Sequence, residues 1–147
     1  MKENKTILRL KDKVSAELYT LLTTGRVLQL TLKKEWYQKI ASGEKKEEYR
    51  EVKPYWAKRI SGIWIWKGKK KGMFPDLENS FMADWDINKF NKYDAIIFLN
   101  GYGDVPTMIV EHDKTEIKQG NERWGALAKQ FYFTLKLGNV LYSEPCS

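Results

Sequence analysis

The chain has little cysteine, little histidine and no long apolar run, and each scarcity excludes a class of protein. Its 147 residues include one cysteine, Cys146, and one histidine, His112. An internal disulfide therefore cannot form, and a metal site is not expected. The longest apolar run spans Ala95–Leu99, far below the roughly 18 residues that a membrane-spanning helix needs. With no apolar secretion signal at the N-terminus, the sequence predicts a soluble, cytoplasmic protein without metal, cofactor or membrane partner.

Positive charge, by contrast, is abundant and unevenly distributed. Lysine and arginine total 26 and aspartate and glutamate 19, which gives a net charge of +7. Residues 1–74 hold 19 cations and 8 anions, a net of +11, whereas residues 75–147 hold 7 and 11, a net of −4. A basic half favours a polyanion as partner, and the 14% of aromatic residues could hold unstacked bases. A solubilising coat of lysine is the alternative explanation.

The periodicity of apolar residues predicts one domain of mixed helices and strands. Helices are expected at residues 14–22, 33–42 and 54–60. Strands are expected at residues 27–32, 61–66, 94–100, 107–111, 115–118, 131–137 and 140–142. Gly25 and Gly43 are expected to end the first two helices, and Gly138 and Asn139 to form a hairpin turn. Residues 74–91 are expected to form a loop or a lid.

A polar run, SGEKKEEYRE, follows the second expected helix and occupies residues 42–51. Its spacing of Gly43, Lys45, Glu48 and Arg50 gives the pattern G-x-K-x-x-E-x-R. Such a run either faces water, as a charged edge strand does, or lines a site. In a plain strand Glu48 and Arg50 share one face and Lys45 points to the other. These side chains therefore converge only if Lys45 lies in the turn before the strand, or at a bulge.

The residue types in this run suit the recognition of a base or a nucleotide. Arginine offers a planar fork of donors for phosphate or base edges, and glutamate accepts a hydrogen bond from an exocyclic amine. Lysine neutralises phosphate or, when desolvated beside cations such as Lys46, becomes a nucleophile or a base. Tyr49 is expected to face the core rather than to stack on a base.

Other candidate ligand-binding residues lie outside the run. Asn100 and Tyr102 close a buried strand and either reach the ligand or only form the turn. Trp124 is either a stacking platform or a loop anchor. A basic loop near residue 70 is either a solvated turn or a contact with the phosphate backbone. The lysines of this loop are Lys67, Lys69, Lys70 and Lys71.

The G-x-K-x-x-E-x-R spacing resembles the signature of the ASCH domain family, a branch of the PUA-like superfamily. The resemblance covers roughly residues 27–142. It implies an α+β fold, namely a small PUA-like β-barrel of about six strands with two or three peripheral helices. Residues 1–26 would then be an N-terminal extension, partly helical, and residues 27–147 the ASCH domain. The resemblance also implies that Lys45, Glu48 and Arg50 line a cleft, and that Gly43 permits close backbone approach.

Three classes of function are compatible with these features. The first is a protein that binds RNA or a nucleotide. The second is an enzyme, because some ASCH proteins are amidohydrolases that remove the acetyl group from N4-acetylcytidine with the signature lysine, a threonine and a glutamate. Here Lys45 is retained, Glu48 stands where those enzymes have the threonine, and Glu122 is a candidate for the other carboxylate; a ribonuclease using Lys45 is a further option. The third is a protein-interaction module using the apolar residues near 81–85.

Overall fold

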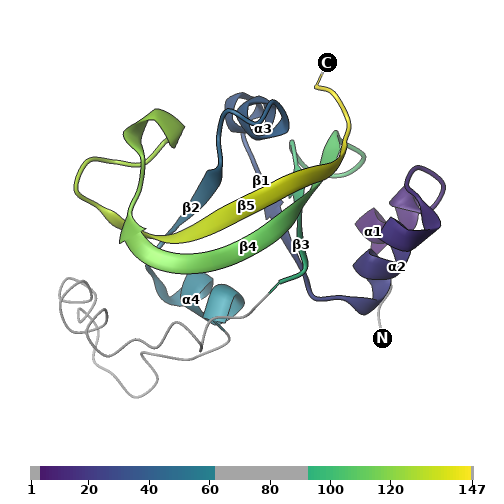
Figure 1. The fold of residues 1–147 in the computed structure, drawn as a ribbon, viewed down its shortest axis with the longest axis horizontal. Helices are drawn as coiled ribbons and strands as arrows, with labels where there is room; N and C mark the ends of the chain where they lie inside the picture. Colours follow the sequence, from purple (N-terminus) through teal and green to yellow (C-terminus); the bar gives the residue numbers. More distant parts are fainter. Residues whose placement is uncertain (1–3, 62–92, 147) are drawn as a thin grey trace. The chain divides into compact units, whose positions relative to one another are not determined.

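The computed structural model of the chain describes residues 4–61 and 93–146, and all elements named below lie within these ranges (Figure 1). The helices are α1 (Lys5–Leu10), α2 (Ala16–Thr24), α3 (Lys34–Ala41), α4 (Pro54–Ser61) and the short 3-10 helix η4 (Glu122–Trp124). The strands are β1 (Val27–Thr31), β2 (Glu47–Glu51), β3 (Ala95–Leu99), β4 (Thr107–Gln119) and β5 (Phe131–Ser143). The predicted α+β class is confirmed for this part of the chain.

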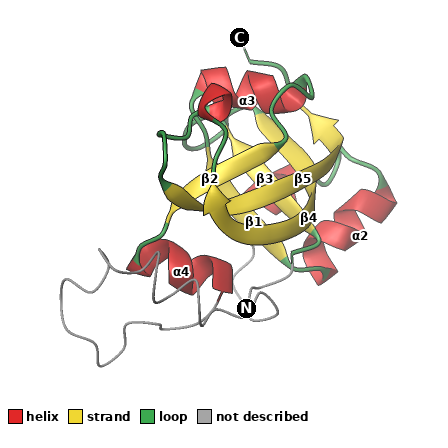
Figure 2. Ribbon diagram, turned by 60° about the vertical axis from the view of Figure 1, so that its left-hand side comes forward, coloured by secondary structure: helices red, strands yellow, loops and turns green. Residues whose placement is uncertain are grey.

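The described strands form one five-stranded sheet in the order β1-β3-β4-β5-β2 (Figure 2). β1 is parallel to β3, with Leu30 beside Phe98, whereas β3 pairs with β4 and β2 pairs with β5 in antiparallel fashion. β3 is buried at every position, as expected for a continuously apolar strand between two neighbours. The sequence predicts about six strands, and the one expected at residues 61–66 lies outside the described residues except for Ser61, which ends α4.

β4 is longer than the sequence predicts, because it runs without interruption where two strands were expected. The residues that would separate those strands, 112–114, continue the extended backbone of β4. Within them His112 is buried, and its Nδ1 lies 3.3 Å from the backbone nitrogen and 3.2 Å from the backbone oxygen of Tyr93. The histidine is therefore anchored to the backbone beside it and marks no turn.

β5 also continues through Gly138 and Asn139, so the predicted hairpin turn is wrong. The backbone N–H of Asn139 donates to Oε1 of Glu111 at 3.1 Å. A methyl group added to Gly138 would lie 3.0 Å from Cβ of Glu111. The glycine thus lets two chain segments approach closely, a use of glycine within a strand that local sequence cannot distinguish from a turn.

The chain divides into two compact units. The first comprises Met1–Lys46, Tyr93–His112 and Leu137–Ser147, and the second comprises Glu47–Lys92 and Asp113–Lys136. The core of the first unit includes Leu10 and Leu22 from the N-terminal helices, packed with Ala95, Ile97, Leu99 and Ile109. The predicted boundary between residues 26 and 27 stays a prediction, although residues from both sides of it share this core.

The N-terminal segment carries two helices where one was predicted. The first helix, α1, follows the cap residue Asn4, whose side chain accepts hydrogen bonds from the backbone of Thr6 and Ile7. The helix predicted at residues 14–22 is present as α2 and ends at Gly25, as expected. Because α1 has only six residues, its apolar positions are too few to establish a helical period in the sequence.

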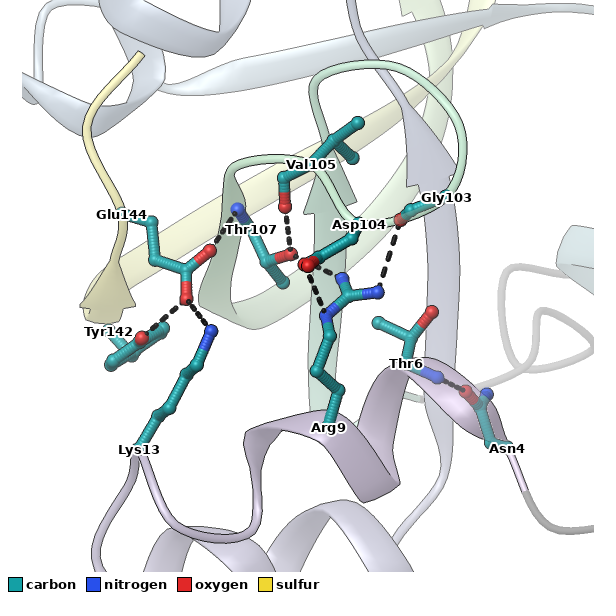
Figure 3. Close-up of polar contacts among 10 residues, drawn as sticks. All are labelled: Asn4, Thr6, Arg9, Lys13, Gly103, Asp104, Val105, Thr107, Tyr142 and Glu144. Carbon is teal, nitrogen blue, oxygen red and sulfur yellow. Dashed lines mark hydrogen bonds and ion pairs between the residues drawn. The ribbon is translucent and has the colours of Figure 1, made fainter. Parts of the chain in front are cut away.

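Arg9 ties α1 to the loop that follows β3 (Figure 3). Its Nη1 donates to the carbonyl oxygen of Gly103 at 3.1 Å, and its Nη2 donates to Oγ1 of Thr107 at 3.2 Å. Its Nε lies 3.2 Å from Oδ1 of Asp104. One arginine therefore holds the loop and the start of β4 by three contacts, which gives the first helix a structural role within the first unit.

The helices on either side of the polar run are predicted well. α3, expected at residues 33–42, spans Lys34–Ala41 and buries Tyr37 and Ile40. Gly43 follows it with φ at +84°, the left-handed conformation expected of a residue that ends a helix. α4, expected at residues 54–60, begins at Pro54 as predicted.

Candidate ligand-binding site

The polar run begins in the turn after α3 and ends in β2. Gly43 donates its backbone N–H to the carbonyl oxygen of Ile40 at 3.0 Å, and Lys45 donates its own to that of Lys39 at 2.9 Å. These bonds fold the segment back on the end of the helix, so Lys45 lies before β2 starts at Glu47. Convergence of the signature side chains requires Lys45 to lie either in the turn before the strand or at a bulge. The structure has the first of these arrangements.

The side chain of Lys45 is buried against Trp36. Its exposed fraction is 3%, which is exceptional for a lysine. Its Nζ lies 4.7 Å from the centroid of the Trp36 ring, and Nζ of Lys39 lies 5.2 Å from the same centroid. The negative face of an indole attracts ammonium groups, by about 2 kcal/mol where they are desolvated. The ring therefore helps to hold a lysine charge away from bulk water.

A pocket of about 170 Å³ opens beside this turn, within the first unit. Three of its lining residues, Gly43, Lys45 and Lys46, belong to the polar run. The remaining lining residues are Ile40, Ala41, Ser42, Val110, Leu137, Gly138, Asn139 and Val140. The pocket thus combines apolar walls with two lysines and an amide. It is smaller than the roughly 300–1,000 Å³ of sites for drug-sized ligands, which suits a single ring or a phosphate group.

The remaining signature residues form a cluster in the second unit. Glu48 and Arg50 lie two residues apart on β2 and so share a face of the strand. Glu48 is 6% exposed, and its Oε2 lies 2.8 Å from Nη2 of Arg50. The guanidinium carbon of Arg50 lies 4.8 Å from the centroid of the Trp56 ring in α4. Arg50 is thus fixed by a carboxylate and by an aromatic face.

The opposite face of β2 carries a hydrogen-bonded cluster that the sequence analysis missed. Glu47, 8% exposed, accepts from the hydroxyl of Tyr49 at 2.7 Å and lies 2.8 Å from Nζ of Lys118. The Tyr49 oxygen in turn accepts the backbone N–H of Asn121 at 2.9 Å. Burial, followed by the hydrogen bond to Glu47 and the negative charges of Glu47 and Glu48, raises the pKa of Tyr49 well above its usual value, although the N–H of Asn121 acts in the opposite direction. The two-residue spacing of Glu47 and Tyr49 is the sequence feature that could have predicted this pair.

Asn100 and Tyr102, two further candidates, are not among the residues that line the pocket. The side chain of Asn100 donates to the carbonyl oxygen of Leu32 at 3.1 Å and lies 3.6 Å from Sγ of Cys146. Tyr102 is 88% exposed between two glycines of left-handed conformation. Asn100 therefore joins the end of β3 to the backbone of Leu32, and Tyr102 projects from a loop.

The last candidates lie in the second unit or outside the described residues. Glu122 is exposed in η4, and Trp124 is half-buried in the same short helix. The lysines of the basic loop, Lys67, Lys69, Lys70 and Lys71, lie outside the described residues, as do the expected lid at residues 74–91 and the apolar residues 81–85.

The described ranges contain neither a cluster of metal-ligating side chains nor a helix suited to cross a membrane. No three histidine, cysteine, aspartate or glutamate side chains of residues 4–61 and 93–146 are grouped as the ligands of a metal ion would be. None of the helices described has both the length and the apolar character needed to cross a membrane.

These observations define an α+β protein in which three charged side chains of one short run, those of Lys45, Glu47 and Glu48, are buried. No family model, no curated protein and no solved structure matches the chain. The ASCH resemblance therefore depends on the signature residues themselves and stays a prediction.

Proposed function

We propose that this chain is an RNA- or nucleotide-binding protein of the ASCH type, with a PUA-like barrel. The observation that carries the proposal is the burial of the signature charges, since Lys45 is 3% and Glu48 is 6% exposed. An edge strand that uses charge only for solubility leaves that charge in water. Burial of charge is costly and is found where the groups are paired or functional.

The contact groups suit the parts of a nucleotide. The apolar walls at Ile40 and Leu137 offer contact to a ring, and Lys45 and Lys46 offer positive charge to a phosphate. Arg50 presents a planar guanidinium that is supported by Glu48, a geometry that matches phosphate or a base edge. The basic first half of the sequence adds a long-range attraction for polyanions.

The proposal is tested by equilibrium binding of labelled single-stranded RNA and of nucleotides at low and moderate salt. Lys46→Ala, Lys45→Met and Arg50→Lys should each weaken binding, and affinity should fall as salt rises. Lys45→Met keeps most of the buried stem of the side chain, and Arg50→Lys keeps the charge while losing the planar fork. Lys11→Ala, at an exposed residue of the N-terminal segment, is the charge control. Binding that responds to neither the three variants nor salt would refute the proposal.

A second candidate function is an amidohydrolase acting on N4-acetylcytidine, favoured by the burial of Lys45 at the edge of a small pocket. Against it stand the pairing of Glu48 with Arg50 and the exposure of Glu122. Chromatography of N4-acetylcytidine incubated with wild type and with Lys45→Ala decides the matter. Cytidine formed only by the wild type supports an amidohydrolase, and its absence excludes this activity. RNA incubated in the same way tests a ribonuclease.

A further inference from the structure

α4 presents an aromatic and cationic face that the signature does not include. Ala57 and Ile60 are fully buried and form the core-facing side of the helix. Tyr55, in the first turn, is 58% exposed, and Lys58 is also exposed. An exposed tyrosine beside a lysine is unremarkable alone, and the distinguishing feature here is the way in which neighbouring side chains hold the ring.

The Tyr55 ring is held in place by Arg59 and Trp56. Nη1 of Arg59 donates to the Tyr55 hydroxyl at 3.2 Å, and its guanidinium carbon lies 5.6 Å from the ring centroid. The same guanidinium lies 5.3 Å from the centroid of Trp56. The rings of Tyr55 and Trp56 meet edge to face with centroids 4.8 Å apart. Tyr55 is therefore oriented by two neighbours while more than half of it remains accessible.

The stretch of sequence that contains this helix carries charge of one sign. No aspartate or glutamate occurs between Val52 and Pro75, whereas seven lysines and arginines do. In the described part of this stretch the cations are Lys58, Arg59 and Lys53, the last of which is paired with Glu51 at 3.6 Å. A one-signed stretch of this length attracts a polyanion, and phosphate contacts tolerate loose geometry.

We propose that α4 binds single-stranded nucleic acid, with a base stacked on Tyr55 and the adjoining phosphates paired with Lys58 and Arg59. Aromatic rings combined with cations are the usual means of holding unpaired bases without regard to sequence. The inference deepens the proposed function, on which it rests for the class of ligand, by making that ligand a strand rather than a free nucleotide. A duplex hides the faces of its bases and binds less well at such a site.

The test is fluorescence anisotropy of a labelled oligouridylate, with a duplex RNA of equal length and free UMP as comparison ligands. Tyr55→Ala should weaken binding of the oligouridylate by roughly five- to a hundredfold, since one stacked base is lost. Tyr55→Phe keeps the ring and should bind nearly as the wild type does. Arg59→Lys keeps the charge but loses the planar group, so its affinity should lie between those of Tyr55→Ala and Tyr55→Phe. Leu8→Ala, which truncates another exposed helical side chain, should leave the affinity for the oligouridylate unchanged.

The outcomes separate this inference from the proposed function. Unchanged affinity in Tyr55→Ala, with a loss in Lys45→Met, overturns the role of α4 and leaves the proposed function standing. A loss in Tyr55→Ala with none in Lys45→Met, Lys46→Ala or Arg50→Lys supports α4 and overturns the signature site. Equal affinity of wild type for duplex and single strand overturns stacking on Tyr55. Failure of the wild type to bind the oligouridylate overturns the inference, and UMP binding then decides whether the pocket binds nucleotides.

Discussion

The ammonium group of Lys45 lies 4.7 Å from the centroid of the Trp36 ring, and the two residues come from the turn after α3 and from α3 itself. The backbone N–H of Lys45 donates a hydrogen bond to the carbonyl oxygen of Lys39. This bond brings the chain back along the helix and so places the lysine beside the ring. The ring also faces the ammonium group of Lys39 at 5.2 Å. The Trp36 ring therefore contacts two cations. Lys45 lines the pocket and Lys39 does not.

Replacing Trp36 should release Lys45 from its position. Trp36→Leu removes the attraction of the aromatic face, and the lysine charge then prefers water to a buried site. We expect weaker nucleotide or RNA binding by about two- to thirtyfold, from a contact of roughly 0.5–2 kcal/mol. Trp36→Phe, which retains a weaker aromatic face, should restore part of the affinity. Titration of the same labelled RNA measures both variants.

The control for this prediction is Lys39→Ala, which removes the second cation near the ring. Because Lys39 does not line the pocket, its loss should change affinity only by the general effect of one surface charge. Equal losses in Lys39→Ala and Trp36→Leu would contradict a positioning role for the indole. Thermal unfolding of all three variants identifies any loss of binding that arises from loss of the fold.

The sequence predicts well what is determined locally. α3, the left-handed Gly43 and the start of α4 at Pro54 each follow from a helical period or from a residue with a restricted backbone. The position of Lys45 before β2 follows from the same helix end. These features need no distant contact, and their boundaries are right to within one residue.

What depends on distant contacts could not be predicted. Gly138 resembles a turn residue in sequence, but its reason is the proximity of Glu111, 27 positions earlier in the sequence. The burial of Glu47 depends on Lys118, which only the pairing of the sheet brings near.

Gly43 should resist substitution by alanine for a conformational reason. Its φ is +84°, and a methyl group placed there would meet only Nζ of Lys46, at 3.8 Å. The cost of Gly43→Ala therefore comes from the left-handed backbone and should be about 1–2 kcal/mol of unfolding free energy. Gly43→Asn should cost less, because asparagine tolerates this conformation. Urea unfolding compares the two, and equal losses would show that space rather than backbone conformation limits this site.

Glu144 joins the C-terminal segment to the start of β4, as Figure 3 shows. Its Oε1 accepts the backbone N–H of the fully buried Thr107 at 3.0 Å, and its Oε2 accepts from the Tyr142 hydroxyl at 2.7 Å. Glu144→Ala should lower the unfolding free energy by about 1–3 kcal/mol, because a buried N–H loses its acceptor. Glu144→Gln retains an acceptor and should cost less.

The ion pair made by the same carboxylate should matter little. Nζ of Lys13 lies 3.5 Å from Oε2 of Glu144, and the lysine is largely exposed. Pairs of this kind contribute about 0–1 kcal/mol, so Lys13→Ala should be nearly neutral in urea unfolding. A loss in Lys13→Ala as large as that in Glu144→Ala would show that the charge pair, and not the hydrogen bond to Thr107, holds this end of the chain.

Tyr142 should make stability depend on pH in the alkaline range. Burial, followed by the hydrogen bond to Glu144 and the negative charge of that residue, raises the pKa of Tyr142 to about 12. An unfolded tyrosine has a pKa of about 10, so between these values the folded chain retains a proton that the unfolded chain has lost. The contribution of Tyr142 to stability is therefore complete below pH 10 and declines as pH rises toward 12.

The matched variant is Tyr142→Phe, compared with the wild type by urea unfolding at several pH values from 8 to about 12. The wild type should be more stable at pH 8, and the difference should shrink as pH rises, because only the tyrosine has a proton to lose. Tyr37, whose pKa burial also raises, is present in both proteins and cancels in the difference. A difference that stays constant across the range would mean that Tyr142 titrates alike in the folded and unfolded chains. The hydrogen bond to Glu144 would then contribute no preference for the protonated ring.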